Sequence, residues 1–475
     1  MNTSELPVLV VDLDNTLLKS DLLFESFWSA FGSDWKVLFG AIAYLCMGKS
    51  KLKNYLAKKS RIDVTTLPYN LDVVSYVEAH RQAGGRTALV TASDYSLAHS
   101  IAAHLCIFDE VHGSDGNHNL KGVAKAEFLV GHFGETKFDY MGDARADLHV
   151  WKYAQKAITV NVATSVLKKL EEMGKPCESF VSDRSSVSYV RALRPHQWLK
   201  NIIIFLPMIS GHQLNFGTFN RSLTAFIAFS LVASSVYILN DLLDLNSDRT
   251  HPRKRFRSFA SGDIPIVSGC WMALFLLCAG FITAAALGTA FLIVMLAYYA
   301  LTTAYSLNLK KRVVMDICVL SSLYTIRILA GGIAGSISLS EWLLAFSIFF
   351  FFSLATIKRQ AELVDMVKRG ALLATGRGYT IDDLPIICTI AISTGYVSVL
   401  VMALYVNSPS VATLYANTTA LWVICFILLY WITRIAFITH RGLMLDDPVI
   451  FAAKDRVSQI CFLAILACLV LGTLS

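Results

Sequence analysis

Four polar side chains that end a long apolar run could together hold a metal ion. They are Asn240, Asp241, Asp244 and Asp248. If this stretch is helical, the three aspartates occupy positions i, i+3 and i+7 and share one face. Stacked carboxylates repel one another unless a hard divalent cation binds them, and Mg²⁺ bound in this way completes its coordination with water and substrate phosphates. The spacing therefore predicts a magnesium and diphosphate site, and the alternative is a solvated helix end.

A second group of polar residues follows shorter apolar runs within residues 1–165. The run at residues 7–11 predicts a buried parallel strand, and such a strand delivers its C-terminal residues to the active edge of a doubly wound sheet. Two later runs end near residues 91 and 142, with a helical stretch between them. The polar residues concerned are Asp12, Asp14, Thr91, Lys125, Asp143 and Asp147. We expect them to meet at one edge of an α/β domain.

These residues resemble, in order and spacing, the four motifs of the haloacid dehalogenase (HAD) superfamily, over about residues 6–165. The resemblance implies a Rossmann-like α/β domain in which Asp12 is the nucleophile that forms an aspartyl-phosphate and Asp14 is the general acid. Because the second acid is present, the phosphatase branch fits better than the dehalogenase branch. The implied Mg²⁺ ligands are Asp12, Asp14, Asp143 and Asp147. The residues implied to bind the phosphoryl group are Thr91 and Lys125, with Lys121 as the alternative lysine.

The stretch between the first two motifs is long enough for a helical cap over the phosphatase site, at about residues 20–75. Its segment Trp35–Met47 is apolar, is too short to span a bilayer, and is followed by five lysines. Such a helix could lie in the membrane interface, which would fit a lipid-linked substrate, or it could form the buried core of the cap. Charged residues and a serine-rich stretch at residues 166–190 predict a linker to a second domain.

The composition of the chain indicates that most of it belongs in a membrane. Of its 475 residues, 55% are hydrophobic, and the mean hydropathy is +0.53. These values are too apolar for an ordinary soluble enzyme, and the length allows more than one domain. The sequence predicts an all-α integral membrane domain over residues 191–475. Ten scattered cysteines without a metal-ligand spacing favour reduced thiols over a disulfide framework.

Nine hydrophobic spans are predicted in this domain. They lie at roughly 199–212, 219–241, 267–287, 289–306, 314–334, 341–357, 384–405, 417–437 and 457–474. With the N-terminal domain in the cytosol, every basic loop falls on the cytosolic side, as the positive-inside rule requires. The basic loops are residues 251–255, 310–312, 358–369 and 434–441. The arrangement predicts a multi-pass protein of the cytoplasmic (inner) membrane with the HAD domain and both active sites on its cytoplasmic side.

The membrane half resembles the UbiA superfamily of intramembrane prenyltransferases, which have nine helices and an NDxxDxxxD motif after the second. Residues 240–248 complete that motif. The second acidic motif of the superfamily is incomplete, because Leu320 stands where an aspartate should follow Asp316. A closer resemblance is to the branch that transfers phosphoribose to decaprenyl phosphate, over about residues 190–475. It rests on the segments Arg194–Asn201, Asp248–Lys254, Ser306–Lys310 and Lys358–Leu363.

This resemblance implies two substrates, phosphoribosyl diphosphate and a polyprenyl phosphate. The first carries phosphate groups at both ends, so one metal site cannot neutralise it and additional lysines and arginines are required. Asp241 and Asp244 would be the catalytic metal ligands of the transferase. The candidate phosphate ligands are Lys200, Arg249, Arg253, Lys254, Lys310, Lys358 and Arg359. For any one of these basic residues, the alternative role is an anchor at the membrane surface.

Together the two halves imply consecutive reactions. The membrane domain would transfer 5-phosphoribose to the lipid phosphate as diphosphate leaves with Mg²⁺, and the HAD domain would then remove the 5-phosphate. One alternative is an aromatic polyprenyltransferase that uses prenyl diphosphate and is fused to an independent phosphatase. Another is a transporter whose acidic cluster binds cations. The membrane bilayer is an expected partner, and nucleic acid is not.

Overall fold

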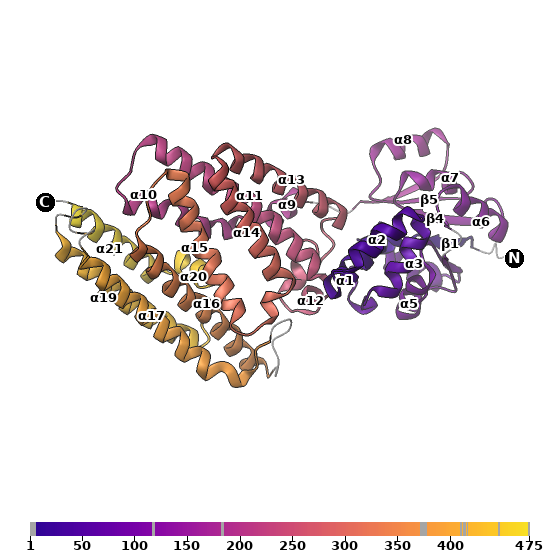
Figure 1. Cartoon of the computed structure of the whole chain (residues 1–475). Coiled ribbons are helices and arrows are strands. Elements are labelled where there is room, and N and C mark those ends of the chain that lie inside the picture. The colour runs from indigo at the N-terminus through magenta and orange to yellow at the C-terminus, as the bar shows by residue number, and fades with distance from the viewer. Residues whose placement is uncertain are drawn as a thin grey trace. The chain divides into compact units, whose positions relative to one another are not determined.

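The computed structural model describes residues 6–115, 119–181, 185–370, 378–408, 411, 415, 417–444 and 447–473. The chain divides into two compact units (Figure 1). The first unit consists of residues 1–192 and 238–272, and the second of residues 193–237 and 273–475. Within the described residues, the strands belong to the first unit and the second is built from helices.

The first unit contains a six-stranded parallel sheet with the strand order β3-β2-β1-β4-β5-β6. Leu9, Val10 and Val11 of the central strand are fully buried, as expected for a parallel strand that is covered on both faces. Because all the strands run in one direction, their carboxyl ends lie at one edge. The strands are β1 (Val8–Val11), β2 (Thr87–Asp94), β3 (Glu110–Ser114), β4 (Phe138–Gly142), β5 (Ala157–Val160) and β6 (Cys177–Phe180).

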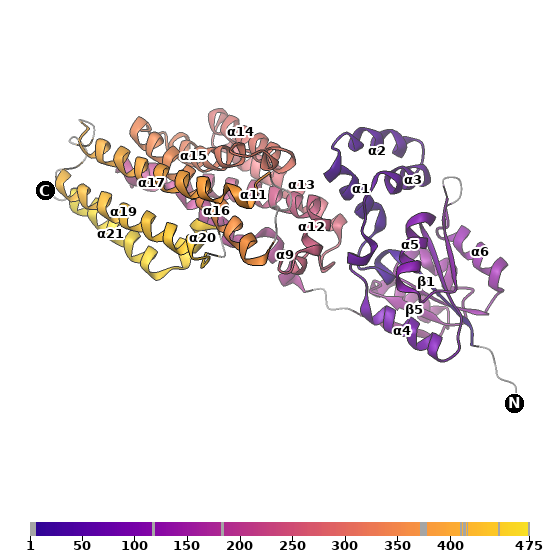
Figure 2. The same cartoon turned by 90° about the horizontal axis from the view of Figure 1, so that it is seen from below.

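Helices cover both faces of this sheet, and the alternation of side chains along β1 assigns them to the two faces. Leu9 and Val11 pack in one core with Val73, whereas Val10 packs in a second core with Leu129. The first core includes α4 (Leu71–Gln82) and α5 (Tyr95–Leu105), and the second includes α6 (Val123–Phe133), α7 (Leu148–Trp151) and α8 (Thr164–Glu172) (Figure 2). This layered arrangement is the α/β fold that the sequence predicts.

A helical insertion follows β1, where the sequence predicts a cap. It consists of α1 (Leu22–Ser33), α2 (Val37–Cys46), α3 (Lys49–Lys59) and a 3₁₀ turn, η2 (Val64–Thr66). The next helix, α4, packs on the sheet. The three helices of the cap share a small core of their own, which is formed by Ala30, Val37, Ala41, Leu52 and Leu56.

The segment predicted as a linker, residues 166–190, is in large part a continuation of the α/β domain. It contains most of α8 and the strand β6, which pairs with β5 from Cys177 to Phe180. Glu178 of β6 forms a 2.6 Å ion pair with Lys156. The linker prediction is therefore wrong up to Phe180, because an edge strand that exposes every second residue has the polar composition of a linker. Helix α9 (Ser186–Leu193) follows.

Long apolar helices make up most of the remaining chain. Within the described residues, eight helices have the length and hydropathy of membrane spans. They are α11 (Phe216–Leu243), α13 (Ile266–Ala286), α14 (Thr289–Leu307), α15 (Met315–Gly335), α16 (Glu341–Arg369), α17 (Leu384–Val406), α19 (Thr418–His440) and α21 (Arg456–Thr473). The short elements are η4 (Pro195–Phe205), α10 (Leu206–Ser210), α12 (Leu245–Thr250), η5 (Lys254–Phe256), η6 (Leu309–Lys311), η7 (Ile381–Asp383) and α20 (Pro448–Lys454).

The first of the nine predicted spans, residues 199–212, does not form a spanning helix. Its residues form most of η4 and the five-residue helix α10, which begins at Leu206 with Pro207 in its first turn. A helix of the predicted length reaches only about 21 Å, which is less than the hydrocarbon core of about 30 Å. The other eight predicted spans correspond to long helices. The sharp turn between α13 and α14 falls at Gly288, whose φ of 107° favours glycine.

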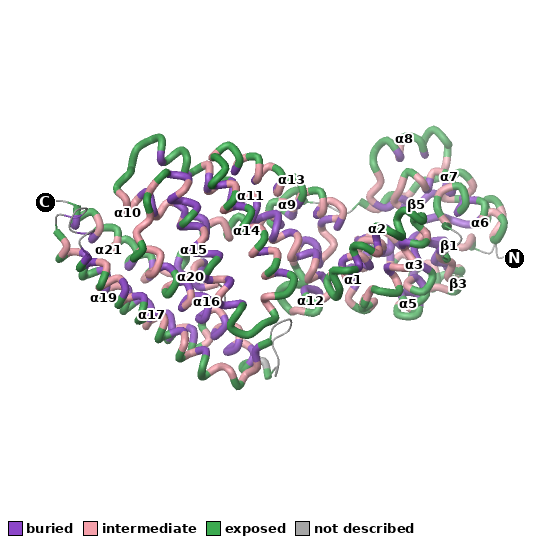
Figure 3. Tube along the Cα trace, viewed as in Figure 1, coloured by how far each residue is buried: buried purple, intermediate pink, exposed green. Residues whose placement is uncertain are grey.

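Glycine brings η4 against α15 inside the second unit. A Cβ atom added at Gly331 would lie 2.1 Å from the carbonyl oxygen of Ile204, so only glycine allows this approach of the two backbones. Of the apolar window of α15, 67% is buried, whereas the corresponding value for α13 is 22% (Figure 3). Phe275 and Ile282 of α13 are each 72% exposed, as expected for side chains that face lipid. The deeply buried helix α15 is therefore the element on which polar side chains can converge.

Candidate active sites

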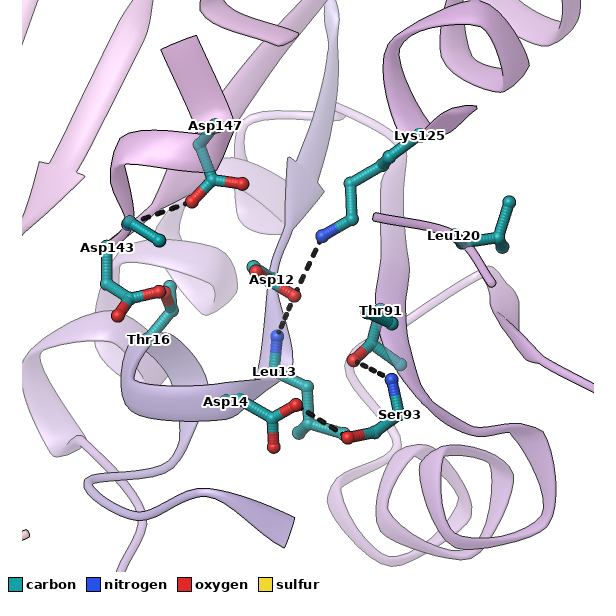
Figure 4. A network of polar contacts seen from close by, with 12 residues as sticks. Asp12, Leu13, Asp14, Thr16, Thr91, Ser93, Leu120, Lys125, Asp143 and Asp147 are labelled. Carbon is teal, nitrogen blue, oxygen red and sulfur yellow. Dashed lines mark hydrogen bonds and ion pairs between the residues drawn. The ribbon is translucent and has the colours of Figure 1, made fainter. Parts of the chain in front are cut away.

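The first candidate site lies at the carboxyl edge of the sheet, around Asp12. This residue directly follows β1, and its Oδ1 atom lies 3.0 Å from Nζ of Lys125. Lys125 is only 2% exposed, so little water screens the attraction between the two charges. In Figure 4, Asp12 lies between the acidic pair Asp143 and Asp147 on one side and Thr91 and Lys125 on the other. The structure thus brings together residues that end or follow three apolar runs of the sequence and a lysine from the helix α6 between two of them.

Asp12, Asp143 and Asp147 form a group whose carboxylate oxygens lie within 4.8 Å of one another. Burial, and then the negative charges of Asp12 and Asp147, raise the pKa of Asp143 to about 8. A divalent cation would stabilise such crowded carboxylates as anions, and a donor set made only of oxygen suits Mg²⁺. These three residues therefore fit the magnesium site that the sequence predicts.

A buried chain of hydrogen bonds fixes two members of this site. Nζ of Lys125 donates to the hydroxyl of Tyr140 at 2.9 Å, and that hydroxyl donates to Oδ1 of Asp147 at 2.9 Å. The Ala144 amide donates to the second oxygen of Asp147 at 2.9 Å. Tyr140 thus contacts both Lys125 and Asp147, and the sequence analysis missed it. The sequence indicates this residue only weakly, by a tyrosine hydroxyl near the end of the predicted strand β4.

Asp14 is placed for proton transfer and lies outside the group of metal-binding carboxylates. Its Oδ1 accepts a hydrogen bond from the Leu22 amide at 2.8 Å, and its Oδ2 accepts one from the Ser93 hydroxyl at 2.5 Å. Burial, and then the charges of Asp21 and Asp12, raise the pKa of Asp14 to about 7. A carboxyl group with a pKa near 7 suits a general acid. This geometry is consistent with the acid role predicted for Asp14, and the group of three carboxylates around Asp12 does not include Asp14.

Thr91 lies in β2 and is fully buried. Its hydroxyl oxygen accepts a hydrogen bond from the amide of Ser93, at 3.0 Å, and Ser93 in turn holds Asp14. Of the two lysines that the sequence offers for the phosphoryl group, Lys125 is buried beside the nucleophile, whereas Lys121 is exposed. The geometry therefore favours Lys125.

The cap supplies a further lysine to this site. Nζ of Lys53, on α3, donates to the carbonyl oxygen of Ala92 at 2.6 Å, and the neighbouring Asn54 donates to Asp94 at 3.1 Å. Burial lowers the pKa of Lys53, and the negative charge of Asp14 opposes this shift. The sequence analysis missed Lys53 as a site residue because it is one of several closely spaced lysines. Their spacing does not reveal which one turns toward the sheet.

The second candidate site contains the acidic motif at residues 240–248. The helix predicted for this motif is interrupted at Asp244, between α11 and α12. Asp241 and Asp248 are buried, and Nη1 of Arg257 lies 3.2 Å from Oδ1 of Asp241 and 2.6 Å from Oδ2 of Asp248. Burial, opposed by the charge of Arg257, raises the pKa of Asp248 to about 6. One arginine therefore bridges the first and last aspartates of the motif.

The oxygen donors of this motif suit Mg²⁺ by their chemistry, but the structure gives two of them a basic partner. Asn240 and Asp244 are half-buried. Among the described residues, the aspartates of the motif do not meet as closely as the three carboxylates around Asp12. A cation bound here would share Asp241 and Asp248 with Arg257. The sequence analysis missed Arg257 as a partner because a non-helical bend separates it from the aspartates.

Arg249, which the sequence assigns to a phosphate group, forms a buried ion pair within the first unit. Its Nη1 and Nη2 donate to the two carboxylate oxygens of Glu25 at 3.0 and 2.6 Å, and its Nε donates to the Ala260 carbonyl at 3.1 Å. The two side chains are 3% and 1% exposed. The buried carboxylate of Glu25 already balances this guanidinium, which does not favour the phosphate role that the sequence predicts for Arg249. Arg253 and Lys254 are exposed on the segment that follows.

Two lysines share one carboxylate inside the second unit. Nζ of Lys200, on η4, and Nζ of Lys358, on α16, lie 2.8 and 2.9 Å from Oδ2 of Asp447. Burial acts to raise the pKa of Asp447, but the charges of the two lysines lower it well below its usual range. The sequence analysis missed Asp447, since two adjacent aspartates before a proline have no spacing that indicates a site. The structure brings together Lys200 and Lys358, both of which the sequence predicts as phosphate ligands.

A buried arginine on α15, Arg327, shares an aromatic neighbour with Lys200. Nε of Arg327 donates to Oδ1 of Asn201 at 2.8 Å, and Nη2 donates to the Tyr298 hydroxyl at 3.1 Å. Arg327 and Lys200 lie over the ring of Tyr324, at 5.5 and 5.9 Å from its centroid. Ionisable side chains buried in a membrane domain are costly and mark functional sites. We name Lys200, Arg327 and Lys358, with Asp447, the basic cluster.

Arg359, also on α16, faces a different set of partners. It forms an ion pair with Glu362, and its Nε lies 2.5 Å from Oδ2 of Asp316. The Tyr379 hydroxyl donates to the other oxygen of Asp316 at 2.5 Å. Because two carboxylates already balance Arg359, the structure does not support its assignment to phosphate. Lys310 is half-buried in η6.

Comparisons with known proteins agree with the division of the chain. The family model of the UbiA prenyltransferase family matches residues 203–442. The uncharacterized protein y4nM of Sinorhizobium fredii is 37% identical over 95% of this chain and 88% of its own length. A decaprenyl-phosphate phosphoribosyltransferase of Mycolicibacterium smegmatis is 32% identical over 64% of this chain and 96% of its own length. A solved UbiA homolog from Archaeoglobus fulgidus, bound to GPP and Mg²⁺, is 16% identical, with a TM-score of 0.47, over 60% of this chain and 99% of its own.

These findings define the class of the protein as an integral membrane enzyme. The chain belongs to the UbiA prenyltransferase family. Its first unit adds an α/β domain that carries the residues of a HAD-type phosphatase at the carboxyl edge of a parallel sheet. The match to y4nM covers nearly the whole chain, so this relative shares both parts.

Proposed function

We propose that the membrane domain transfers 5-phosphoribose from phosphoribosyl diphosphate to a polyprenyl phosphate, and that the HAD domain removes the 5-phosphate from the product. The main support is the basic cluster, in which two lysines contact one carboxylate and Arg327 lies over the same tyrosine ring as Lys200, so that the cluster offers surplus positive charge to an anion. The relatives named decaprenyl-phosphate phosphoribosyltransferase, which match the membrane domain, support the same reaction.

The transfer is a substitution at the anomeric carbon of ribose. The bond from this carbon to the diphosphate oxygen breaks, the diphosphate leaves with the electron pair, and an oxygen of the polyprenyl phosphate bonds to the carbon. Positioning and charge stabilisation are the main contributions of a protein to such a step. We assign Lys200 and Lys358 to the phosphate groups of the donor, because each can exchange an oxygen of Asp447 for a phosphate oxygen. Mg²⁺ held by Asn240, Asp241, Asp244 and Asp248 would balance the charge of the diphosphate.

The dephosphorylation uses the first site. A carboxylate oxygen of Asp12 attacks the phosphorus atom of the monoester, and the bond between phosphorus and the sugar oxygen breaks. Asp14, with its raised pKa, gives a proton to the departing oxygen and then accepts one from the water that hydrolyses the aspartyl-phosphate. Thr91 and Lys125 bind the phosphoryl oxygens. Asp12, Asp143 and Asp147 would hold a Mg²⁺ ion that offsets the phosphate charge.

We place both reactions on the cytoplasmic side of the cytoplasmic membrane. The connections at residues 251–255 and 310–312 are rich in lysine and arginine. The other two predicted basic loops, residues 358–369 and 434–441, lie almost wholly in the C-terminal ends of α16 and α19, which carry basic residues as well. The positive-inside rule assigns such segments to the cytoplasm. Because eight long helices are described and not nine, this orientation requires residues 195–210, which form η4 and α10, to carry the chain across the membrane before α11 begins. Labelling of single cysteines in these loops with a reagent that does not cross membranes would test the orientation.

The reading as an aromatic polyprenyltransferase has less support. A prenyl diphosphate enzyme of this family needs the second acidic motif, whose remaining member here is Asp316. The two oxygens of Asp316 already contact Arg359 and Tyr379, and Leu320 supplies no carboxylate. Of the two acidic motifs, the one at residues 240–248 is thus our candidate for a metal and diphosphate.

The proposal is tested with purified full-length protein in lipid nanodiscs. The protein is given Mg²⁺, phosphoribosyl diphosphate labelled in the ribose, and a polyprenyl phosphate, and the lipid products are separated by charge. We expect the label to enter the lipid fraction as polyprenyl-phosphoryl ribose without the 5-phosphate. Incorporation from labelled prenyl diphosphate into an aromatic acceptor, with none from phosphoribosyl diphosphate, would show that the proposed substrate is wrong.

A further inference from the structure

Helix α2 of the cap exposes most of its apolar side chains. Among its residues, only Val37 and Ala41 are buried, and they pack in the small core of the cap. The sequence left open whether this segment is the buried core of the cap, and the structure excludes that alternative. The exposed fractions are 55% for Trp35, 38% for Leu38, 63% for Phe39, 55% for Ile42, 38% for Tyr44, 52% for Leu45 and 62% for Met47. We name these seven residues the apolar face of α2.

Lysines surround the apolar face. From Trp35 to Ser60 the sequence contains six lysines and no acidic residue. An exposed apolar helix with lysines beside it matches the surface of an anionic bilayer, because the apolar side chains enter the boundary of the hydrocarbon and the ammonium groups meet lipid phosphates. Five of the lysines are exposed, and they are Lys36, Lys49, Lys51, Lys58 and Lys59.

The sixth lysine connects this surface to the phosphatase site. Lys53 lies on α3, which begins at Lys49 directly after α2, and its Nζ donates to the carbonyl oxygen of Ala92 beside Asp14. The helix with the apolar face and the helix that reaches the site are therefore packed neighbours in one small core. A surface that binds α2 is therefore close to the helix that carries Lys53 to the phosphatase site.

We propose that α2 docks the cap on the surface of an anionic bilayer, so that the HAD site takes its phosphomonoester from a lipid held in that bilayer. The bilayer is favoured over a protein partner because the chain carries eight apolar spanning helices and because the lysines around α2 call for an anionic surface. The helix lies on the bilayer and does not span it, since ten residues are too few. The lipid nature of the monoester rests on the proposed function, whereas the docking does not.

The docking is measured on full-length protein in nanodiscs of phosphatidylcholine and phosphatidylglycerol. The exposed native cysteines, at positions 46, 106, 177 and 278, are replaced by serine. A single cysteine is introduced by Phe39→Cys on the apolar face or, as a control, by Glu135→Cys at an exposed position elsewhere in the domain, and is labelled with an environment-sensitive fluorophore. We expect lipids that carry a quencher below the headgroup to quench the label at position 39 and not the label at position 135. The quenching should weaken in nanodiscs of phosphatidylcholine alone.

Equal, water-like emission from the two positions would overturn the docking. A blue-shifted emission at position 39 that lipid quenchers do not affect would also overturn it, because a second copy of the chain or another protein surface would then cover α2.

The consequence for substrate use is measured with Phe39→Glu/Ile42→Glu, which changes two exposed positions. The matched control is Leu71→Glu, a residue 71% exposed on α4 of the same domain. We expect kcat/KM for the 5-phosphorylated ribosyl lipid in nanodiscs to fall at least tenfold in the double variant only, with hydrolysis of soluble p-nitrophenyl phosphate unchanged. An unchanged kcat/KM on the lipid would overturn the role of α2. If wild-type protein failed to hydrolyse the lipid while lipid still quenched the label at position 39, the proposed function would be wrong and the docking would stand.

Discussion

Lys200 and Lys358 lie on different helices, and their ammonium groups approach the same oxygen of Asp447, at 2.8 and 2.9 Å. Two cations that approach one oxygen repel each other, and the shared carboxylate relieves that repulsion. A phosphate group of a substrate offers several anionic oxygens in place of the single oxygen of Asp447. The arrangement therefore holds two lysines ready for a larger anion.

Replacing either lysine should weaken the use of the sugar donor. We expect Lys200→Met and Lys358→Met each to raise KM for phosphoribosyl diphosphate about tenfold or more, since a hydrogen bond to a charged group contributes about 1.5–3 kcal/mol. Lys368→Met is the matched control, because Lys368 is exposed and contacts only backbone carbonyls in the structure. Steady-state kinetics with each substrate varied in turn would measure the effect. A rise confined to KM for the lipid would assign the lysines to membrane anchoring.

The acidic motif should be required for transfer and dispensable for dephosphorylation. We expect Asp241→Asn to abolish ribosyl transfer, because the loss of one carboxylate leaves the departing diphosphate poorly neutralised. Hydrolysis of p-nitrophenyl phosphate by the same preparation should persist and serves as the control for folding. Transfer at a near wild-type rate would show that residues 240–248 are not the diphosphate site.

The two activities should separate at Asp12. The variant Asp12→Asn keeps the shape of the side chain and removes the attacking carboxylate, so transfer should continue and the 5-phosphorylated lipid should accumulate. Asp14→Asn should act similarly and leave slow formation of the aspartyl-phosphate, because only proton transfer is lost. Chromatography of the lipid products would distinguish the two outcomes. Identical lipids from wild type and Asp12→Asn would mean that the phosphatase acts on another substrate.

Tyr140 should affect the phosphatase through its two partners. We expect Tyr140→Phe to raise the Mg²⁺ concentration for half-maximal hydrolysis of p-nitrophenyl phosphate by about 10–100-fold, because it removes the hydroxyl that links Lys125 to Asp147. Tyr153→Phe is a suitable control, since Tyr153 is half-buried in the same core and is not a member of the hydrogen-bonded chain from Lys125 through Tyr140 to Asp147. An unchanged Mg²⁺ dependence in Tyr140→Phe would limit this tyrosine to packing.

Arg249 should contribute to stability and not to substrate binding. We expect Arg249→Met to lower the free energy of unfolding by about 3–5 kcal/mol, because it leaves the buried carboxylate of Glu25 without a partner. The double variant Arg249→Met/Glu25→Leu should recover much of that loss, since no buried charge remains. Denaturant-induced loss of phosphatase activity would measure both values. A raised KM for phosphoribosyl diphosphate without a loss of stability would restore the phosphate role of Arg249.

The sequence by itself determined the α/β domain and most of the phosphatase site. Asp12, Thr91 and Asp143 each follow or end an apolar run, and parallel strands bring their carboxyl ends to one edge of a sheet. Apolar segments long enough to cross a bilayer likewise identified eight of the long helices. These features depend on patterns of hydrophobicity within single segments, and such patterns can be detected in the sequence alone.

Only the tertiary structure decided which charges meet. Arg249 pairs with Glu25, Arg359 with Asp316, and Lys200 with Asp447, although nothing in the local sequence of any arginine or lysine marks its partner. The same holds for α2, whose apolar residues suited a buried core as well as a membrane surface. The free energy of a charge or an apolar side chain depends on what surrounds it in space, and those surroundings come from segments far apart in the chain.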